Sequence, residues 1–137
     1  MKLLDSMPEL TGLPQAHQKG LFSERNLHPQ KVSVFYFWSS DCAFCKRWPQ
    51  FIEQVEQLYG DKVQCIVVHV GSIQSADVPN VKVANLIDIN KELSDKFQVR
   101  FFPAIYIFDQ ERKLRYRQAG SSETRMLVKR IEKFLER

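Results

Sequence analysis

Residues 32–49 read VSVFYFWSSDCAFCKRWP, and this stretch decides how the rest of the chain folds. The apolar run from Val32 to Trp38 is typical of a strand buried on both faces, as in a parallel sheet. Two cysteines, Cys42 and Cys45, follow it, and an amphipathic helical pattern comes next. The pair therefore lies where a strand passes into a helix, which indicates redox chemistry in a small α/β chain.

The start of the expected helix favours a reactive thiolate at Cys42. The first turn of a helix presents unpaired N–H groups and the positive end of the helix dipole. A thiolate is stabilised there, and the thiolate is the reactive form of cysteine. Cys45 lies three residues further on, on the same side of the helix, and it can close a disulfide with Cys42.

We expect this helix over residues 42–59. Its apolar residues recur at helical spacing and form one stripe, made of Phe44, Trp48, Phe51, Ile52, Val55, Leu58 and Tyr59. Asp41 is the expected N-cap, and Gly60 is the expected stop. The ring nitrogen of Pro49 cannot donate to the carbonyl four residues back, so a kink is predicted at Pro49.

The rest of the chain reads as one α/β domain over residues 1–137. Residues 1–22 are expected to form an irregular lead-in with one short strand, followed by a helical turn capped by Ser23. Strand 63–70 should run parallel to the first strand through a right-handed crossover. The remaining elements are expected as strands 83–89, 104–108 and 114–118, the last of them antiparallel, and as helices 90–98, capped by Asn90, and 122 onward.

Composition restricts the class of protein. A hydrophobic content of 44% and a charged content of 26% are those of a soluble globular chain. The net charge of +4 gathers late in the sequence, where a solvated hairpin and helix face explain it, and no nucleic-acid-binding module is present. The segment Lys2–Leu4, which Asp5 and Pro8 follow, is too short for the apolar region of a signal peptide or for a membrane span. We therefore expect a cytoplasmic monomer without membrane or nucleic-acid partners; an anchored or secreted form would imply a truncated chain.

Two separate motifs resemble the thioredoxin superfamily. The first is Phe37–Trp38 with the cysteine pair, a lysine and a helix proline; the second is Val99–Pro103 with the strand Ala104–Phe108. Met7–Gly12 and Arg115–Gly120 are similar to segments of soluble bacterial thiol-disulfide oxidoreductases of the ResA/TlpA type, in particular YkuV-like ones. The resemblance covers nearly the whole chain. It implies a thioredoxin-like α/β fold, with a central mixed β-sheet flanked by helices on both faces.

The resemblance also implies an activity, thiol-disulfide exchange on protein disulfide substrates. Cys42 would attack the substrate and Cys45 would resolve the mixed disulfide, with reduction as the expected direction. The Cys42–Cys45 disulfide is itself the redox group, so we expect no bound cofactor and no metal, and an electron donor that the sequence does not identify. A disulfide oxidase or isomerase, or a redox-inactive thioredoxin-fold binding protein, remains an alternative. A thiol peroxidase is disfavoured, because the Pro-x-x-x-Thr-x-x-Cys arrangement does not precede Cys42.

Further residues are expected around the cysteine pair. The resemblance implies a cis bond at Pro103 facing the cysteines, with the backbone of Phe102 pairing with a bound peptide. Trp38 is either a core aromatic or a lid over the disulfide. Asp41 is either a simple N-cap or a participant in proton transfer.

The sequence departs from the family at two places. Tyr36 stands where thioredoxins often carry a buried carboxylate, and a neutral phenol cannot act as the same base near neutral pH. Pro49 comes four residues after the second cysteine, where relatives usually show five. The group that transfers the proton is therefore left open.

A zinc site is the rival interpretation of the cysteines. Cys42 and Cys45 could combine with Cys65 and His69 at a finger-like spacing. Residues 65–69 read as a strand, however, and four extended steps cover about 13 Å, so both side chains could not reach one ion. Cys65 is therefore expected as a buried structural thiol, and His69 as a core or surface histidine.

Overall fold

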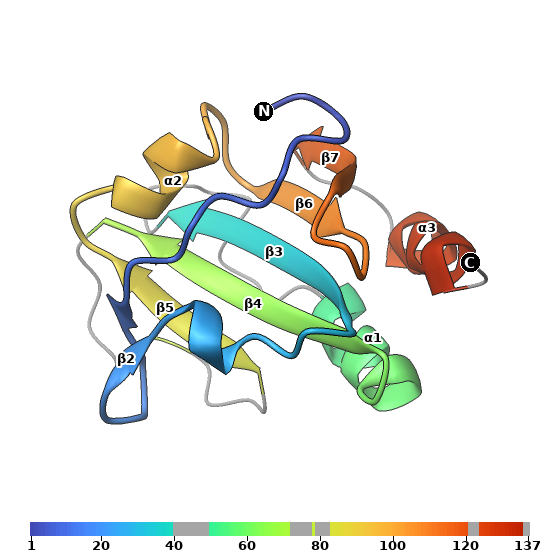
Figure 1. Ribbon diagram of the computed structural model, residues 1–137, viewed down its shortest axis with the longest axis horizontal. Coiled ribbons are helices and arrows are strands. Elements are labelled where there is room, and N and C mark those ends of the chain that lie inside the picture. Colours follow the sequence, from blue (N-terminus) through green and yellow to red (C-terminus); the bar gives the residue numbers. More distant parts are fainter. Residues whose placement is uncertain (40–49, 72–77, 79–82, 121–123, 136–137) are drawn as a thin grey trace.

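The computed structural model describes residues 1–39, 50–71, 78, 83–120 and 124–135. A five-stranded sheet has the order β5-β4-β3-β6-β7, and a two-stranded sheet lies beside it (Figure 1). The elements are β1 Leu13–Pro14, β2 Leu21–Phe22, the 3-10 helix η1 Glu24–Asn26, β3 Val32–Ser39, α1 Gln50–Tyr59, β4 Val63–Val70, β5 Ala84–Asp88, α2 Glu92–Lys96, β6 Ala104–Phe108, β7 Leu114–Ala119 and α3 Thr124–Leu135.

The central sheet is mixed, as the sequence predicts. β3 runs parallel to β4 from the pair Val32↔Val63 to the pair Ser39↔Val70, and β4 runs parallel to β5. β6 lies antiparallel to β3 on the other side, and β7 is antiparallel to β6. β3 is thus the centre of the sheet, and its carboxyl end leads directly toward residues 40–49.

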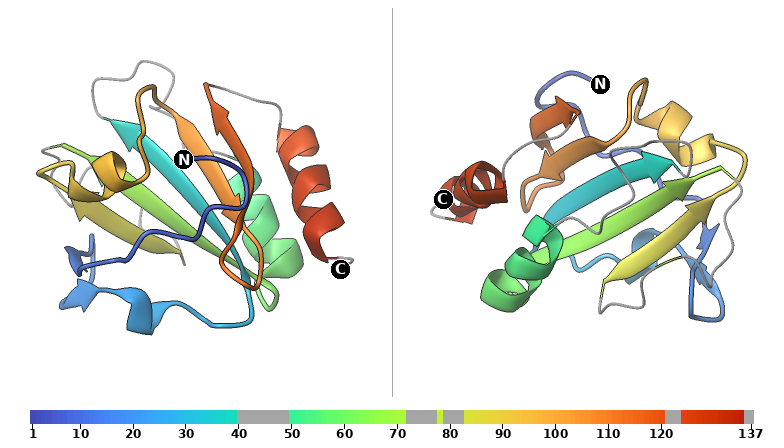
Figure 2. Two further views of the ribbon diagram at one scale, coloured as in Figure 1. Left: turned by 45° about the horizontal axis from the view of Figure 1, so that its top comes forward. Right: turned by 180° about the vertical axis from the view of Figure 1, so that it is seen from behind.

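The period-two alternation of the strands divides the core into two layers. On one face, α1 and α3 cover a cluster that includes Val34, Tyr36, Cys65 and Val67. On the other face, α2 and the N-terminal segment cover a cluster that includes Phe35. Figures 1 and 2 show these helices on opposite sides of the sheet. Both faces of β3 are buried for this reason, which explains its nearly continuous apolar sequence.

Aromatic rings fill the layer under α2. Phe97, at the end of α2, lies 4.9 Å from the ring centroids of both Phe35 and Phe37. It also meets Tyr106 edge to face at 5.2 Å and Phe108 at 5.7 Å. Such geometries add stabilisation beyond the burial of apolar area. Phe97 therefore anchors the segment that leads from α2 into β6.

The cap of α2 differs from the prediction. Lys91, not Asn90, occupies the N-cap position, and its side chain makes no capping hydrogen bond. The carboxylate of Asp88, at the end of β5, accepts hydrogen bonds from the amides of Leu93 at 3.3 Å and Ser94 at 2.9 Å. The prediction that Asn90 caps this helix was wrong, because the preceding strand already delivers a buried carboxylate to its first turn.

The lead-in contains more structure than expected. β1 and β2 form a short antiparallel pair, Leu13↔Phe22 and Pro14↔Leu21, where only one strand was predicted. Ser23 occupies the N-cap of η1 as predicted, and its amide donates to Oδ1 of Asn26 at 2.9 Å. The apolar residues Met7, Leu10 and Leu13 pack into the core under α2. Burial of these side chains holds the N-terminal segment against the sheet, although this segment contains only short strands.

Two predicted helix starts fall outside the described residues. The helix expected over 42–59 is described from Gln50 to Tyr59, and the last helix is described from Thr124. The predicted N-cap at Asp41, the kink at Pro49 and the start at Ser122 lie among the residues that are not described. None of the described helices is long and apolar enough to cross a membrane.

Candidate functional site

The candidate site is the carboxyl edge of β3 and β4. β3 ends at Ser39, and α1 is described from Gln50. Cys42, Cys45 and Asp41 belong to the intervening residues, so their predicted roles stay predictions. The described part of the site consists of the strand ends and loops that surround this connection.

Trp38 is the last aromatic residue before the cysteine pair. It is half-buried and packs against the apolar cluster under α1 and α3. Its ring meets the His69 imidazole edge to face, with the centroids 4.7 Å apart. The indole Nε1 is buried and has no hydrogen-bond partner within the described residues. The core role predicted for Trp38 is therefore present, whereas a role as lid concerns residues that are not described.

His69 is a buried core histidine, only 1% exposed. Its Nε2 lies 3.2 Å from Oδ1 of Asn85, and Nδ2 of Asn85 donates to the carbonyl of Val83 at 3.1 Å. Because Nδ2 of Asn85 donates to the Val83 carbonyl, the side-chain oxygen of Asn85 faces His69. This oxygen accepts a hydrogen bond from Nε2–H of His69. The Nδ1 atom of His69 then carries the lone pair, and it is buried without a partner in the described part of the chain.

The charge of His69 follows from this environment. Burial lowers the pKa of His69 to about 4, the nearby His17 lowers it further, and the hydrogen bond to Asn85 opposes them. The imidazole is therefore neutral at pH 7 and adds no positive charge to this edge of the sheet. The sequence marks His69 by its place at a strand end, but Asn85 was missed. A polar residue inside an otherwise apolar strand was the available signal.

Tyr36 occupies the position two residues before Trp38. It is buried under α1, and burial raises the pKa of its phenol to about 12. The phenol stays neutral across the physiological range, in agreement with the prediction that it cannot replace a carboxylate base. Cys65 lies on the same face and is 4% exposed. Burial, with a smaller contribution from Glu56, raises the pKa of this thiol, which fits the predicted structural role.

The loop before β6 comes to the same edge of the sheet. The Phe102–Pro103 peptide bond is cis, and Pro103 is buried. Phe37 pairs with Ala104 in the antiparallel register of β3 and β6. This pair is the last of the register, and Trp38 and Pro103 are the next residues of the two chains beyond it, at the point where the chain continues toward Cys42. Phe102 is half-buried, and Phe101 is 69% exposed.

The rival zinc site finds no support among the described residues. Cys65 and His69 both belong to β4, an eight-residue strand, as the sequence predicts. In the described part of the chain no three His, Cys, Asp or Glu side chains form a group that could hold a metal ion. His69 instead donates to Asn85, which leaves it a hydrogen-bonding role in the core.

Comparison with known proteins agrees with the architecture. The protein-family model described as a thioredoxin-like domain matches residues 24–135 of this chain. The thiol-disulfide oxidoreductase YkuV of Bacillus subtilis (strain 168) is 32% identical over 145 residues, covering 98% of this chain and 97% of YkuV. A putative thiol:disulfide interchange protein DsbE from Chlorobium tepidum has a TM-score of 0.85 at 19% identity, covering 98% of this chain and 99% of its own. A thioredoxin-like protein solved in solution in its oxidised form has a TM-score of 0.78 at 31% identity, covering 99% and 98%. This chain belongs to the thioredoxin-like family.

Proposed function

We propose that this protein is a thiol-disulfide oxidoreductase that reduces disulfides of protein substrates in the cytoplasm. One observation carries the proposal. β3 ends at Ser39 and α1 is described from Gln50, so the sequence places Cys42 and Cys45 in the connection between the central strand and its helix. In a member of this family, with a full-length relative named for this activity, that connection is where the redox pair is expected.

The proposed reaction is a two-step exchange. The Cys42 thiolate attacks one sulfur of a substrate disulfide, forms a mixed disulfide and releases the other substrate sulfur as a thiolate. The Cys45 thiolate then attacks the Cys42 sulfur, and the second substrate thiolate leaves. The substrate gains two electrons and two protons, and the protein is left with a Cys42–Cys45 disulfide. A dithiol donor must reduce that disulfide before the next turnover, and the pair itself is the only redox group that the reaction requires.

The direction of exchange depends on how strongly the reduced pair is stabilised. Strong disulfide oxidants owe their potential to a stabilised thiolate in the reduced form. His69, the imidazole that contacts Trp38, is neutral at pH 7 and cannot stabilise a thiolate by its charge. The Ala43–Phe44 dipeptide between the cysteines supplies no cation either. These two features favour a reductase over an oxidase.

The proposal is tested by insulin reduction with dithiothreitol as donor, together with the equilibrium potential of the pair against glutathione. We expect the protein to accelerate insulin precipitation, and we expect a potential near that of thioredoxin, about −270 mV. A Cys42→Ser/Cys45→Ser double variant is the control for background reduction by dithiothreitol.

The alternatives give different results in the same measurements. A potential near about −120 to −180 mV would indicate an oxidase or isomerase, because that range belongs to proteins that donate or shuffle disulfides. Insulin reduction by the native protein that is no faster than the background measured with the double variant would indicate a redox-inactive binding protein. Far-UV circular dichroism verifies that the native protein and the double variant are both folded.

A further inference from the structure

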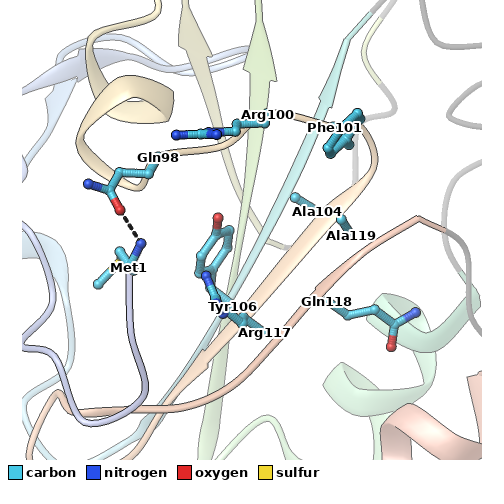
Figure 3. A pocket seen from close by; sticks show the side chains of 9 residues that line it. All are labelled: Met1, Gln98, Arg100, Phe101, Ala104, Tyr106, Arg117, Gln118 and Ala119. Atoms are coloured by element: carbon cyan, nitrogen blue, oxygen red, sulfur yellow. Dashed lines mark hydrogen bonds between the residues drawn. The ribbon is translucent and has the colours of Figure 1, made fainter.

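A cavity opens beside the loop that precedes β6. Its volume is about 390 Å³, and it lies between the α2–β6 connection, β6 and β7 (Figure 3). Three consecutive segments contribute the side chains used here, which are Gln98, Arg100, Phe101, Tyr106 and Arg117. None of the described residues that line it is acidic. The cavity therefore combines aromatic surface with two guanidinium groups.

The position of Arg117 follows from the sheet register. Arg117 pairs with Tyr106 across β6 and β7, so both side chains lie on the face of the sheet that α2 covers. The Tyr106 hydroxyl donates to the Phe97 carbonyl at 3.1 Å, which fixes the ring in place. Burial raises the pKa of Tyr106, and the charge of Arg117 opposes that rise. A neutral aromatic ring thus stands beside a permanently charged guanidinium.

Among the described residues, no acidic neighbour neutralises either arginine of the cavity. Arg100 and Arg117 are exposed, and neither forms an ion pair within the described ranges. The ion pair found there joins Arg115 to Asp109, with Nε 2.7 Å from Oδ2. Arginine recognises carboxylates through its planar fork of N–H donors. The amide of Gln98 adds a further polar group to the wall, and it also accepts a hydrogen bond from the Met1 amine (Figure 3).

The cavity reaches the candidate site through Phe101. This residue forms part of the wall and is 69% exposed. It lies two residues before Pro103, a span of at most about 7 Å along the chain. Pro103 in turn directly precedes Ala104, the partner of Phe37 at the edge of the sheet that leads to the cysteine pair. A polypeptide held at that edge can therefore place a side chain of a nearby residue in the cavity.

We propose that this cavity is a specificity subsite that takes an aspartate or glutamate side chain located near the disulfide of a protein substrate. The inference rests on the proposed function, and it adds the chemical class of substrate. The carboxylate would pair with Arg100 and Arg117, and its aliphatic stem would lie against Tyr106 and Phe101. The net charge of +4 assists the encounter with an acidic segment.

The test uses two disulfide-bonded peptides that differ only in glutamate or glutamine residues flanking the disulfide. The reduced protein is mixed with each peptide, and kcat/KM is measured with dithiothreitol as donor. We expect the glutamate peptide to be reduced about three- to tenfold more efficiently, as two partly exposed ion pairs allow. The preference should shrink as salt is raised, since exposed charges are screened.

Variants separate the cavity from general electrostatics. Arg100→Gln/Arg117→Gln should remove the preference, because kcat/KM for the glutamate peptide should fall to the value for the glutamine peptide. Lys129→Gln/Lys133→Gln is the matched control, because it likewise removes two positive charges, from exposed positions on α3, which covers the opposite face of the sheet. It should keep the preference intact.

Each contrary result has a defined meaning. A preference that persists in the arginine double variant, or that falls equally in Lys129→Gln/Lys133→Gln, overturns the assignment of the cavity. Equal reduction of both peptides by the native protein also overturns the assignment while leaving the proposed function in place. Reduction of neither peptide, together with failure to reduce insulin, overturns the proposed function and the subsite with it.

Discussion

Trp38 and His69 are direct neighbours in the parallel register of β3 and β4, and their rings meet at an interplanar angle of 78°. Both rings carry a buried nitrogen without a partner among the described residues, Nε1 of Trp38 and Nδ1 of His69. The imidazole is held by Asn85 on its other side. This contact joins the ends of the two central strands where the chain continues toward Cys42, and the burial of the imidazole makes the stability of the fold sensitive to acid.

Stability should fall between pH 6.5 and pH 4 because of His69. Its ordinary pKa is 6.5, and its pKa in the folded protein is about 4. Below pH 6.5 the unfolded chain takes up a proton at His69 that the folded protein does not take up until about pH 4, so folding loses stability over that window. We expect a loss of about 1–3 kcal/mol in the free energy of unfolding, measured by urea denaturation at several pH values.

The contribution of His69 is isolated by two variants. His69→Gln removes the titrating group, so its unfolding free energy should change less over this window than that of the native protein. His28→Gln is the control, because His28 is exposed, and it should follow the native profile. Parallel profiles for His69→Gln and the native protein would show that another group causes the loss.

The capping carboxylate of α2 is predicted to matter more than the residue that the sequence marks as the cap. Asp88 is 1% exposed and accepts from two amides at the start of α2, whereas Asn90 is exposed. Asp88→Ala should lower the free energy of unfolding by about 2–3 kcal/mol, because it leaves buried donors unpaired. Asn90→Ala should change it by less than about 0.5 kcal/mol. Urea denaturation of both variants measures the difference, and equal losses would restore Asn90 as the cap.

The fold was predictable where local pattern and tertiary burial agree. The apolar runs that became β3, β4 and β6 are buried on both faces, so their sequences show the strand directly. Asn90 was misread because asparagine favours an N-cap locally, while the competing acceptor, Asp88, is supplied by the end of a strand. The pairing of β1 with β2 was missed because two-residue strands carry no periodicity.

The residues of the candidate site were predictable only where they belong to a short, contiguous sequence motif. The spacing of Cys42 and Cys45 is local, and so is the sequence around Pro103. Arg117, in contrast, reads as one charge of a solvated hairpin, and only its register with Tyr106 places it in a cavity. Asn85 likewise acquires its role from the neighbouring strand, where it fixes the tautomer of His69.

Cys65 should be unreactive in the native protein. Its thiol is 4% exposed, and burial, assisted by the Glu56 carboxylate, raises its pKa. A thiol that stays protonated and covered is neither nucleophilic nor accessible. Of the three cysteines in the chain, we expect two to react with iodoacetamide in the reduced native protein, and all three to react in denaturant. Intact mass after alkylation gives the count.

Substitution of Cys65 gives an independent measure of the same role. Cys65→Ala should lower the free energy of unfolding by about 1–2 kcal/mol, because it leaves a small void between β4 and the helices above it. Insulin reduction by this variant should match that of the native protein. A loss of turnover in a folded Cys65→Ala variant would mean that the thiol takes part in exchange.

The order of attack by the two remaining cysteines is the last prediction. Cys42 is the first of the pair after β3, nearer to the expected helix start, so its thiolate should react with an external disulfide. Removing the resolving sulfur should stop the reaction at the mixed disulfide. Cys45→Ser should therefore accumulate covalent adducts with disulfide-containing proteins, visible on non-reducing gels and by intact mass, and dithiothreitol should release them. Cys42→Ser should trap little. If Cys42→Ser trapped as well as Cys45→Ser, the two cysteines would share the attack, and the proposed order would be wrong.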